Sequence, residues 1–352
     1  MSAPYRFAPA VPKKPATGLV ARVYAQMSEE FLLADGPLMS LSPAPEVLAA
    51  TWALLREAEI VGTASRAEKE AVASAVAFAN RCPFCTEAHA LLIHGAGGHR
   101  LAETVRLGGT PDDPRQAELV RWAKAGRTPG ADVLAAPPVP PEQAAEFLGT
   151  VLVSHFINRM VTSLLDEEAL LPQAVRSSRL VRRAVGCSIG AGARRQPPPG
   201  RSLELLAAVD PGTGAGFAPP AWADEGPIGV AHAALRGVAD AGGALLGGRA
   251  RAVVREVVAA WDGSHADLGT AWLDTPLAEL PAGQRPAARL ALLAGLAPYR
   301  LTEADVASWR DAASGAGAGS GDDGDLVRVL AFGAMAAVAR VEEWTTAAFV
   351  SR

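Results

Sequence analysis

Cysteine is scarce in this chain, which has three among its 352 residues: Cys82, Cys85 and Cys187. So few thiols exclude a disulfide-stapled scaffold and are typical of a protein kept in a reducing compartment. The N-terminal stretch MSAPYRFAPAVPKKPATG also has no apolar core of the kind found in a secretory signal peptide. We therefore expect a cytoplasmic protein.

The sequence also lacks a strong charge of one sign and a long apolar run. Its net charge of −4 provides no basic footprint for nucleic acid or for an anionic membrane. The longest late apolar run, residues 329–339, lies between Arg328 and Arg340 and is too short to span a bilayer, so we expect it to be a buried helix. Nucleic acid and membranes are therefore not expected partners.

Aromatic residues are few, at 5% of the chain, and alanine fills much of the apolar space. With 49% hydrophobic and 20% charged residues the composition is that of a globular protein, and the length allows two domains. Alanine-rich segments without alternating β-branched residues favour closely packed helices. The composition therefore predicts an all-α fold.

The densest group of reactive side chains lies in residues 66–95. Cys82 and Cys85 form a C-x-x-C motif, His89 follows four residues after the second cysteine, and Glu70 lies twelve residues before the first. No other part of the chain carries a comparable set, so we take these four residues as the candidate site.

The local pattern predicts that the cysteines open a helix. Apolar residues recur at helical spacing over residues 66–79, and Asn80 can close that helix in the left-handed conformation. Proline is favoured at the first position of a helix, so Pro83 predicts Cys82 as the N-cap and Cys85 in the first turn. The positive end of the helix dipole favours thiolate over thiol there.

The spacing on this second helix points to thiol redox chemistry. His89 shares a helix face with Cys85, so its imidazole can take the thiol proton or stabilise the thiolate. A carboxylate such as Glu70 can orient that imidazole. A thiolate attacks a peroxide oxygen and becomes a sulfenic acid, and a neighbouring thiol condenses with it to a disulfide. An outside dithiol must then reduce the disulfide.

Other interpretations of the same residues are structural or metal-binding. In the metal-binding interpretation the two cysteines form half of a zinc site, which His89, His94 or His99 could complete. No second C-x-x-C follows, which argues against it. A thioredoxin-type motif needs a preceding strand, and here the pattern is helical. Glu70 could instead be a solvated helix residue, and His89 a hydrogen-bonded histidine of the core.

The pattern E-x11-C-x-x-C-x3-H, with NRCPFCTEAH inside it, resembles the AhpD-like family, also called the carboxymuconolactone decarboxylase-like superfamily. The resemblance implies a helical fold and a relay from Glu70 through His89 to a peroxidatic Cys85 and a resolving Cys82. It further implies a hydroperoxide substrate, a protein or lipoyl-type dithiol reductant, a homo-oligomer, and no metal, flavin or haem cofactor. The family often has a second histidine before the second cysteine, where this chain has Phe84.

The later part of the chain reads as a second, degenerate unit without cysteines in the motif position. When each residue of the first unit is aligned with the residue 182 positions later, Cys85 pairs with Asp267, His89 with Ala271 and Glu70 with Ala252. The glycine-rich residues 315–325 read as a flexible insertion. We predict an extended arm, an AhpD-like redox domain, an arginine-rich linker and a degenerate AhpD-like domain, over residues 1–18, 19–175, 176–228 and 229–352.

A long helix over residues 141–165 is expected to pack on the redox helices. It carries His155 and Asn158, which either line the site or form hydrogen bonds in the packed interior, and we favour the second alternative. The predicted function is that of a thiol-dependent peroxidase. A thiol–disulfide adaptor, a lactone decarboxylase and a non-enzymatic assembly module are the alternatives, and the intact Glu-Cys-Cys-His set argues against the last two.

Overall fold

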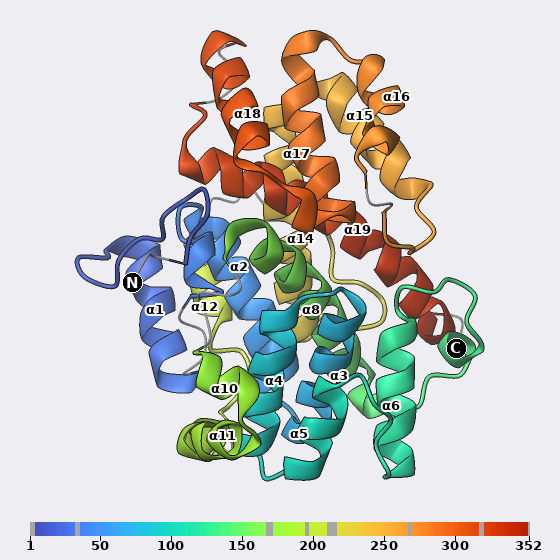
Figure 1. Ribbon diagram of the computed structural model, residues 1–352. Helices are drawn as coiled ribbons and strands as arrows, with labels where there is room; N and C mark the ends of the chain where they lie inside the picture. Colours follow the sequence, from blue (N-terminus) through green and yellow to red (C-terminus); the bar gives the residue numbers. More distant parts are fainter. Residues whose placement is uncertain are drawn as a thin grey trace.

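The computed structural model describes residues 4–31, 36–166, 172–193, 197–209, 217–266, 269–316 and 320–350. Within these ranges the regular structure is helical, and the only β-type pairing is an isolated bridge between Tyr5 and Leu165. The all-α expectation is therefore confirmed (Figure 1).

Helices α1 to α8 make up the first part of the chain, and α2 and α3 pack on α8, which runs through the middle of the molecule (Figure 1). Their bounds are α1 Gly18–Glu30, α2 Pro45–Leu55, α3 Arg66–Ala79, α4 Pro83–Gly95, α5 His99–Arg106, α6 Pro114–Ala125, α7 Asp132–Ala135 and α8 Ala144–Leu164. The remaining helices are α10 Gln173–Ser177, α11 Arg179–Ala193, α12 Leu203–Leu206, α14 Pro227–Ala241, α15 Gly248–Ala259, α16 Asp274–Ala278, α17 Arg285–Leu296, α18 Glu303–Ala316 and α19 Asp323–Val350.

The expected helix over residues 45–61 is not a uniform α-helix. Its second part, Arg56–Ile60, is a π-helical turn, and Gly62 follows it with φ of 112°. A wider turn of this kind rotates the side chains that follow away from 3.6-residue spacing, and such turns are frequent at functional sites. Glu59 lies in this turn and faces the candidate site described below.

The order of helices in the last third parallels that of the first part. Helices α14, α15, α17 and α19 follow one another as α2, α3, α6 and α8 do, and α2 packs on α14 while α8 packs on α19. The match is weakest at α4: residues 262–266 after α15 are not helical, Asp267 lies outside the described residues, and the next α-helix, the short α16, begins only at Asp274. This order supports the tandem repeat, which we keep as a proposal.

The other predicted segments have the following structure. The chain between Pro4 and Thr17 is irregular, with several bends, and Arg6 donates hydrogen bonds to the carbonyl oxygens of Thr162 and Leu301. In the predicted linker, α11 packs on α4. Of the predicted flexible insertion, residues 317–319 lie outside the described residues, and Asp323 begins α19.

Buried apolar side chains from both parts of the chain form one continuous core. Helices α17 and α19 lie very close together at Gly333, where an added Cβ would lie 1.9 Å from the carbonyl oxygen of Ala291. Backbone atoms cannot move aside as a flexible side chain can, so this contact requires glycine.

We expect Gly333→Ala to lower the free energy of unfolding by about 1–3 kcal/mol, the usual cost of overpacking a core. Gly248→Ala is the matched control, because it adds the same methyl group where nothing lies within 4 Å. The control should be neutral or stabilising by up to about 1 kcal/mol. Urea unfolding of both variants measures the difference, and equal midpoints would contradict the assignment of this contact.

Candidate active site

The turn between α3 and α4 presents both cysteines at the start of α4. Cys82 is the N-cap and Pro83 the first helical residue, as the sequence predicts. The left-handed residue of the turn is Arg81, with φ of 57°, and not Asn80, which stays in the right-handed region. The expectation for Asn80 is thus wrong, because its side chain instead forms hydrogen bonds with α8.

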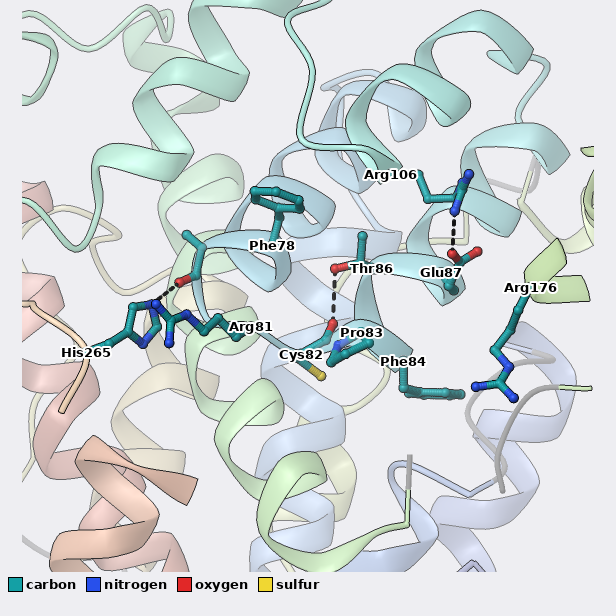
Figure 2. Close-up of a pocket in the computed structure, with 11 residues that line it drawn as sticks. Phe78, Arg81, Cys82, Pro83, Phe84, Thr86, Glu87, Arg106, Arg176 and His265 are labelled. Carbon is teal, nitrogen blue, oxygen red and sulfur yellow. Dashed lines mark hydrogen bonds and ion pairs between the residues drawn. The ribbon is translucent and has the colours of Figure 1, made fainter. Parts of the chain in front are cut away.

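The two cysteines face different cavities, although both are reduced and buried. Cys82 lines a surface groove of about 710 Å³ together with Phe84, Arg106 and Arg176 (Figure 2). Cys85 lines an inner cavity of about 50 Å³. The two cysteines of the motif therefore line two different cavities, a large groove and a much smaller cavity.

A buried ion network lies beside Cys85. His89 Nδ1 lies 2.7 Å from one carboxylate oxygen of Glu70, and Arg66 Nε donates to the other oxygen at 2.6 Å. Glu70 is completely buried, which excludes the interpretation as a solvated helix residue. His89 lines the same cavity as Cys85, so the structure brings together three of the four predicted residues, with Cys82 across the first turn.

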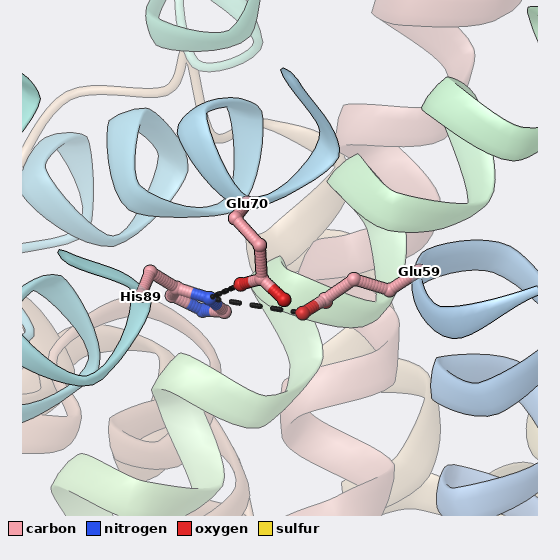
Figure 3. A group of neighbouring side chains, drawn as sticks. All are labelled: Glu59, Glu70 and His89. Carbon is pink, nitrogen blue, oxygen red and sulfur yellow. Dashed lines mark hydrogen bonds and ion pairs between the residues drawn. The ribbon is translucent and has the colours of Figure 1, made fainter. Parts of the chain in front are cut away.

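Sequence reasoning missed Glu59, the second buried carboxylate of this network. One of its oxygens, Oε1, lies 3.7 Å from His89 Nδ1, and potential ligand atoms of Glu59, Glu70 and His89 all lie within 4.8 Å of one another (Figure 3). The only signal in the sequence is a glutamate near the end of a helix, in the run REAEI, and surface helices carry many such residues.

The protonation of this network follows from burial and charge. Burial raises the pKa of Glu59 to about 8, and the neighbouring Glu70 adds to that shift. Burial alone would raise the pKa of Glu70 too, but the charge of Arg66 and the hydrogen bond with His89 lower it to about 2. Burial would lower the pKa of His89, yet the hydrogen bond with Glu70 and the charge of Glu59 raise it to about 9.

At neutral pH these values describe two cations, Arg66 and His89, and one carboxylate, Glu70, with Glu59 protonated. A buried group of charges is stable only when it is paired, so the arrangement has room for one further negative charge. Cys85 lines the same cavity and interacts electrostatically with His89, so an anion held at its sulfur would complete this pairing. The network can thus stabilise an anion in the small cavity that Cys85 lines.

We expect the protein to lose stability as the pH rises from about 6.5 to 9. Since its folded-state pKa is raised, His89 stabilises the fold fully below its ordinary value of 6.5, and this contribution is lost as the pH rises through about 9. Glu59 retains a proton in the folded state between pH 4.5 and about 8, so its contribution to stability also falls as the pH rises through this range. Each group steepens the slope by up to about 1.4 kcal/mol per pH unit.

Thermal unfolding at several pH values measures this slope. Glu59→Gln should make it shallower between pH 6.5 and 8, because the amide does not titrate. A slope that is unchanged in this variant would show that Glu59 does not retain its proton in the folded protein.

Of the three histidines of the zinc alternative, only His89 lines the cavity of Cys85. The Nδ1 atoms of His94 and His99 lie 3.1 Å apart, and Nε2 of His94 contacts Glu103. Among the described residues, the one cluster with suitable spacing for a metal is Glu59, Glu70 and His89, which contains no cysteine. Both carboxylate oxygens of Glu70 already have cationic partners there.

His155 and Asn158 have separate environments on α8. His155 is completely buried and contacts Asn80 and Arg159, so it belongs to the packed interior. Asn158 accepts a hydrogen bond from Asn80 and also lines the inner cavity beside Cys85. Asn80 therefore ties the cysteine turn to α8.

A helical fold in which a C-x-x-C motif begins a helix next to a Glu–His pair defines an AhpD-type protein. The model of the carboxymuconolactone decarboxylase family matches residues 45–125, from α2 through α6. The chain is also 40% identical over 347 residues to the alkyl hydroperoxide reductase Rv2159c of Mycobacterium tuberculosis (strain ATCC 25618 / H37Rv), covering 97% of this chain and 94% of that protein. This chain therefore belongs to the AhpD-like carboxymuconolactone decarboxylase family.

No solved structure matches the chain. None of the described helices has the length and apolar character that crossing a membrane requires.

Proposed function

We propose that the protein is a thiol-dependent peroxidase that reduces hydrogen peroxide or organic hydroperoxides. The observation that carries this proposal is the shared cavity of Cys85 and His89, with His89 paired to the buried Glu70. The relative from M. tuberculosis is named an alkyl hydroperoxide reductase, which agrees with this chemistry. The family model is named for a decarboxylase, but decarboxylation does not use the cysteine pair.

In the proposed cycle Cys85 attacks the terminal oxygen of the hydroperoxide and becomes a sulfenic acid. Cys82, three residues away on the same turn, condenses with it, releasing water and forming a disulfide. A dithiol reductant, a protein or a lipoyl-type group, then restores both thiols by exchange. The groove suits the reductant, because it is open to solvent and is lined by Cys82.

The basic rim of this groove favours a reductant that carries negative charge. Arg81, Arg106 and Arg176 line the groove, as does His265 from the C-terminal part, and one acidic residue, Glu87, pairs with Arg106. Charges of opposite sign on a partner speed encounter and orient it. We also propose a cytoplasmic location and a homo-oligomer, whose size sedimentation velocity measures.

Thiol titration of the reduced protein tests the proposed function. The experiment uses a Cys187→Ser background, because Cys187 is exposed and would add an unrelated thiol. One equivalent of cumene hydroperoxide should consume two thiols per chain, and prior dialysis against EDTA should leave the rate unchanged. A chain that keeps both thiols would not be a peroxidase.

The thiol–disulfide adaptor remains the second candidate, since the open groove beside Cys82 would serve it equally well. An adaptor would form the disulfide with a disulfide donor but not with cumene hydroperoxide. The same titration with both oxidants therefore separates the two functions. A rise in thiol reactivity after EDTA would instead point to the zinc alternative, because removal of the metal frees its cysteine ligands.

A further inference from the structure

The proposed peroxidase function leaves one proton unassigned. When a thiolate cleaves a hydroperoxide, the leaving group is an alkoxide or hydroxide, a much stronger base than the thiolate. General acid catalysis of such a step contributes about 10²–10⁴-fold, provided that the acid reaches the leaving oxygen. The residue that supplies this proton has to lie in the cavity of Cys85.

Glu59 has the location that this step requires. It lines the inner cavity together with Cys85 and His89, and it reaches the cavity from the π-helical turn Arg56–Ile60. The other acidic residue of that turn, Glu57, points elsewhere and accepts hydrogen bonds from Arg56 and Ser202. The wide turn therefore separates two adjacent buried glutamates, one structural and one facing the cavity.

The contacts of Glu59 distinguish it from Glu70. Both carboxylate oxygens of Glu70 are occupied, one by Arg66 and one by His89. Glu59 Oε1 is buried and has no hydrogen-bond partner of normal geometry, although a hydrogen bond with Glu70 contributes to the raised pKa of Glu59, and the side chain is about 1% exposed. An unpartnered buried oxygen in a native structure calls for an explanation, and a substrate that binds in the cavity provides one.

We propose that Glu59 is the general acid of the peroxide cleavage step, donating its proton to the oxygen that leaves as Cys85 attacks. The inference rests on the proposed peroxidase function. His89 is less suited to this task, since its Nδ1 is held by Glu70 and its positive charge balances the thiolate (Figure 3).

The step balances in atoms, electrons and charge. The Cys85 thiolate and the hydroperoxide ROOH, with protonated Glu59, give Cys85 sulfenic acid, the alcohol ROH and the Glu59 carboxylate. The sulfur is oxidised by two electrons, and the O–O bond is reduced by the same two. After the dithiol has restored both cysteines, the proton of the Cys85 thiol returns to Glu59, which regenerates the starting state.

Three probes of Glu59→Gln distinguish proton donation from a structural role. Cumene hydroperoxide releases a strongly basic alkoxide, peracetic acid releases the weak base acetate, and iodoacetamide releases iodide, which needs no proton. Glutamine keeps the shape of glutamic acid but cannot transfer a proton. We expect Glu59→Gln to slow oxidation by cumene hydroperoxide about 100-fold, and to change the peracetic acid and iodoacetamide rates less than about threefold.

Glu57→Gln is the matched control, because it makes the same chemical change in the same turn outside the cavity. It should slow the three reactions equally or not at all. An equal loss for all three probes in Glu59→Gln would overturn the proposal, because it would mean that Glu59 supports the thiolate or the fold. Unchanged rates for all three would overturn it as well.

The wild-type protein provides a second test that needs no variant. The ratio of the cumene hydroperoxide rate to the iodoacetamide rate cancels the ionisation of Cys85. This ratio should fall as the pH rises above about 8, where Glu59 loses its proton. The other charged groups that face Glu59 are Arg66, Lys69 and Glu70 on α3 and His89 on α4, and α8 contributes the neutral Ser154 and Asn158 to the cavity.

Failure of the two proposals can be told apart. If wild type is alkylated rapidly but does not react with cumene hydroperoxide, the peroxidase function is wrong and the role of Glu59 is wrong with it. If wild type reacts rapidly and its rate ratio stays constant across pH 8, only the role of Glu59 is wrong.

Discussion

Cys85→Ser is expected to lower hydroperoxide consumption by more than about a thousandfold, because removal of a nucleophile leaves only background reaction. Cys82→Ser should behave differently. It keeps the attacking sulfur in the inner cavity with His89 and loses only the thiol that condenses with the sulfenic acid. It should therefore react once per chain and then stop.

Mass spectrometry after dimedone trapping measures this difference. One dimedone adduct on Cys85 is expected in Cys82→Ser, and none in Cys85→Ser. Both variants carry Cys187→Ser, so that the exposed third cysteine cannot react. If Cys85→Ser instead gives an adduct on Cys82 and Cys82→Ser gives none, the roles of the two cysteines are reversed. Peroxide would then have to enter through the groove of Figure 2.

The second large effect is expected for Glu70→Gln. Glu70 lies between Arg66 and His89, and an amide cannot balance these two cations. The pKa of His89 should fall from about 9 toward its ordinary value, so the imidazole would no longer stabilise the thiolate at neutral pH. We expect a loss of about 10²–10³ in the rate of thiol oxidation, and a loss of about 3–5 kcal/mol in stability from the broken buried pair.

Glu68→Gln is the matched control for this variant. It lies on the same helix, α3, but pairs with Arg115 at the protein surface, where such pairs contribute at most about 1 kcal/mol. Alkylation by iodoacetamide measures the effect on the thiolate, and urea unfolding measures the stability. Equal results for Glu68→Gln and Glu70→Gln would show that the buried network does not support the cysteine.

The local sequence pattern was sufficient to predict much of the structure of helices α3 and α4. Pro83 after Cys82 predicts the start of α4, and the helical spacing predicts α3 to within its observed ends. The contact between Glu70 and His89 was also predictable, because each lies on the inner face of its helix and the two helices are joined by a short turn. The catalytic roles of these residues remain predictions.

Glu59 was not predictable in the same way. It lies thirty residues before His89, on a turn whose π-helical geometry follows no 3.6-residue pattern. The position of Asn80 was misjudged for a related reason. Its conformational preference allows the left-handed region, but two hydrogen bonds to α8 from its side chain outweigh that preference, and Arg81 makes the turn.

The sequence by itself determined the helical class, the start of α4 at the cysteines and the residues available for thiol chemistry, because caps, prolines and i+4 spacing act between near neighbours. The tertiary structure alone decided that Cys82 faces the groove and Cys85 the inner cavity. It also decided that Glu59 joins His89 and Glu70. Packing of distant helices creates these environments, and burial then sets which groups hold protons, since a buried charge is stable only beside an opposite one.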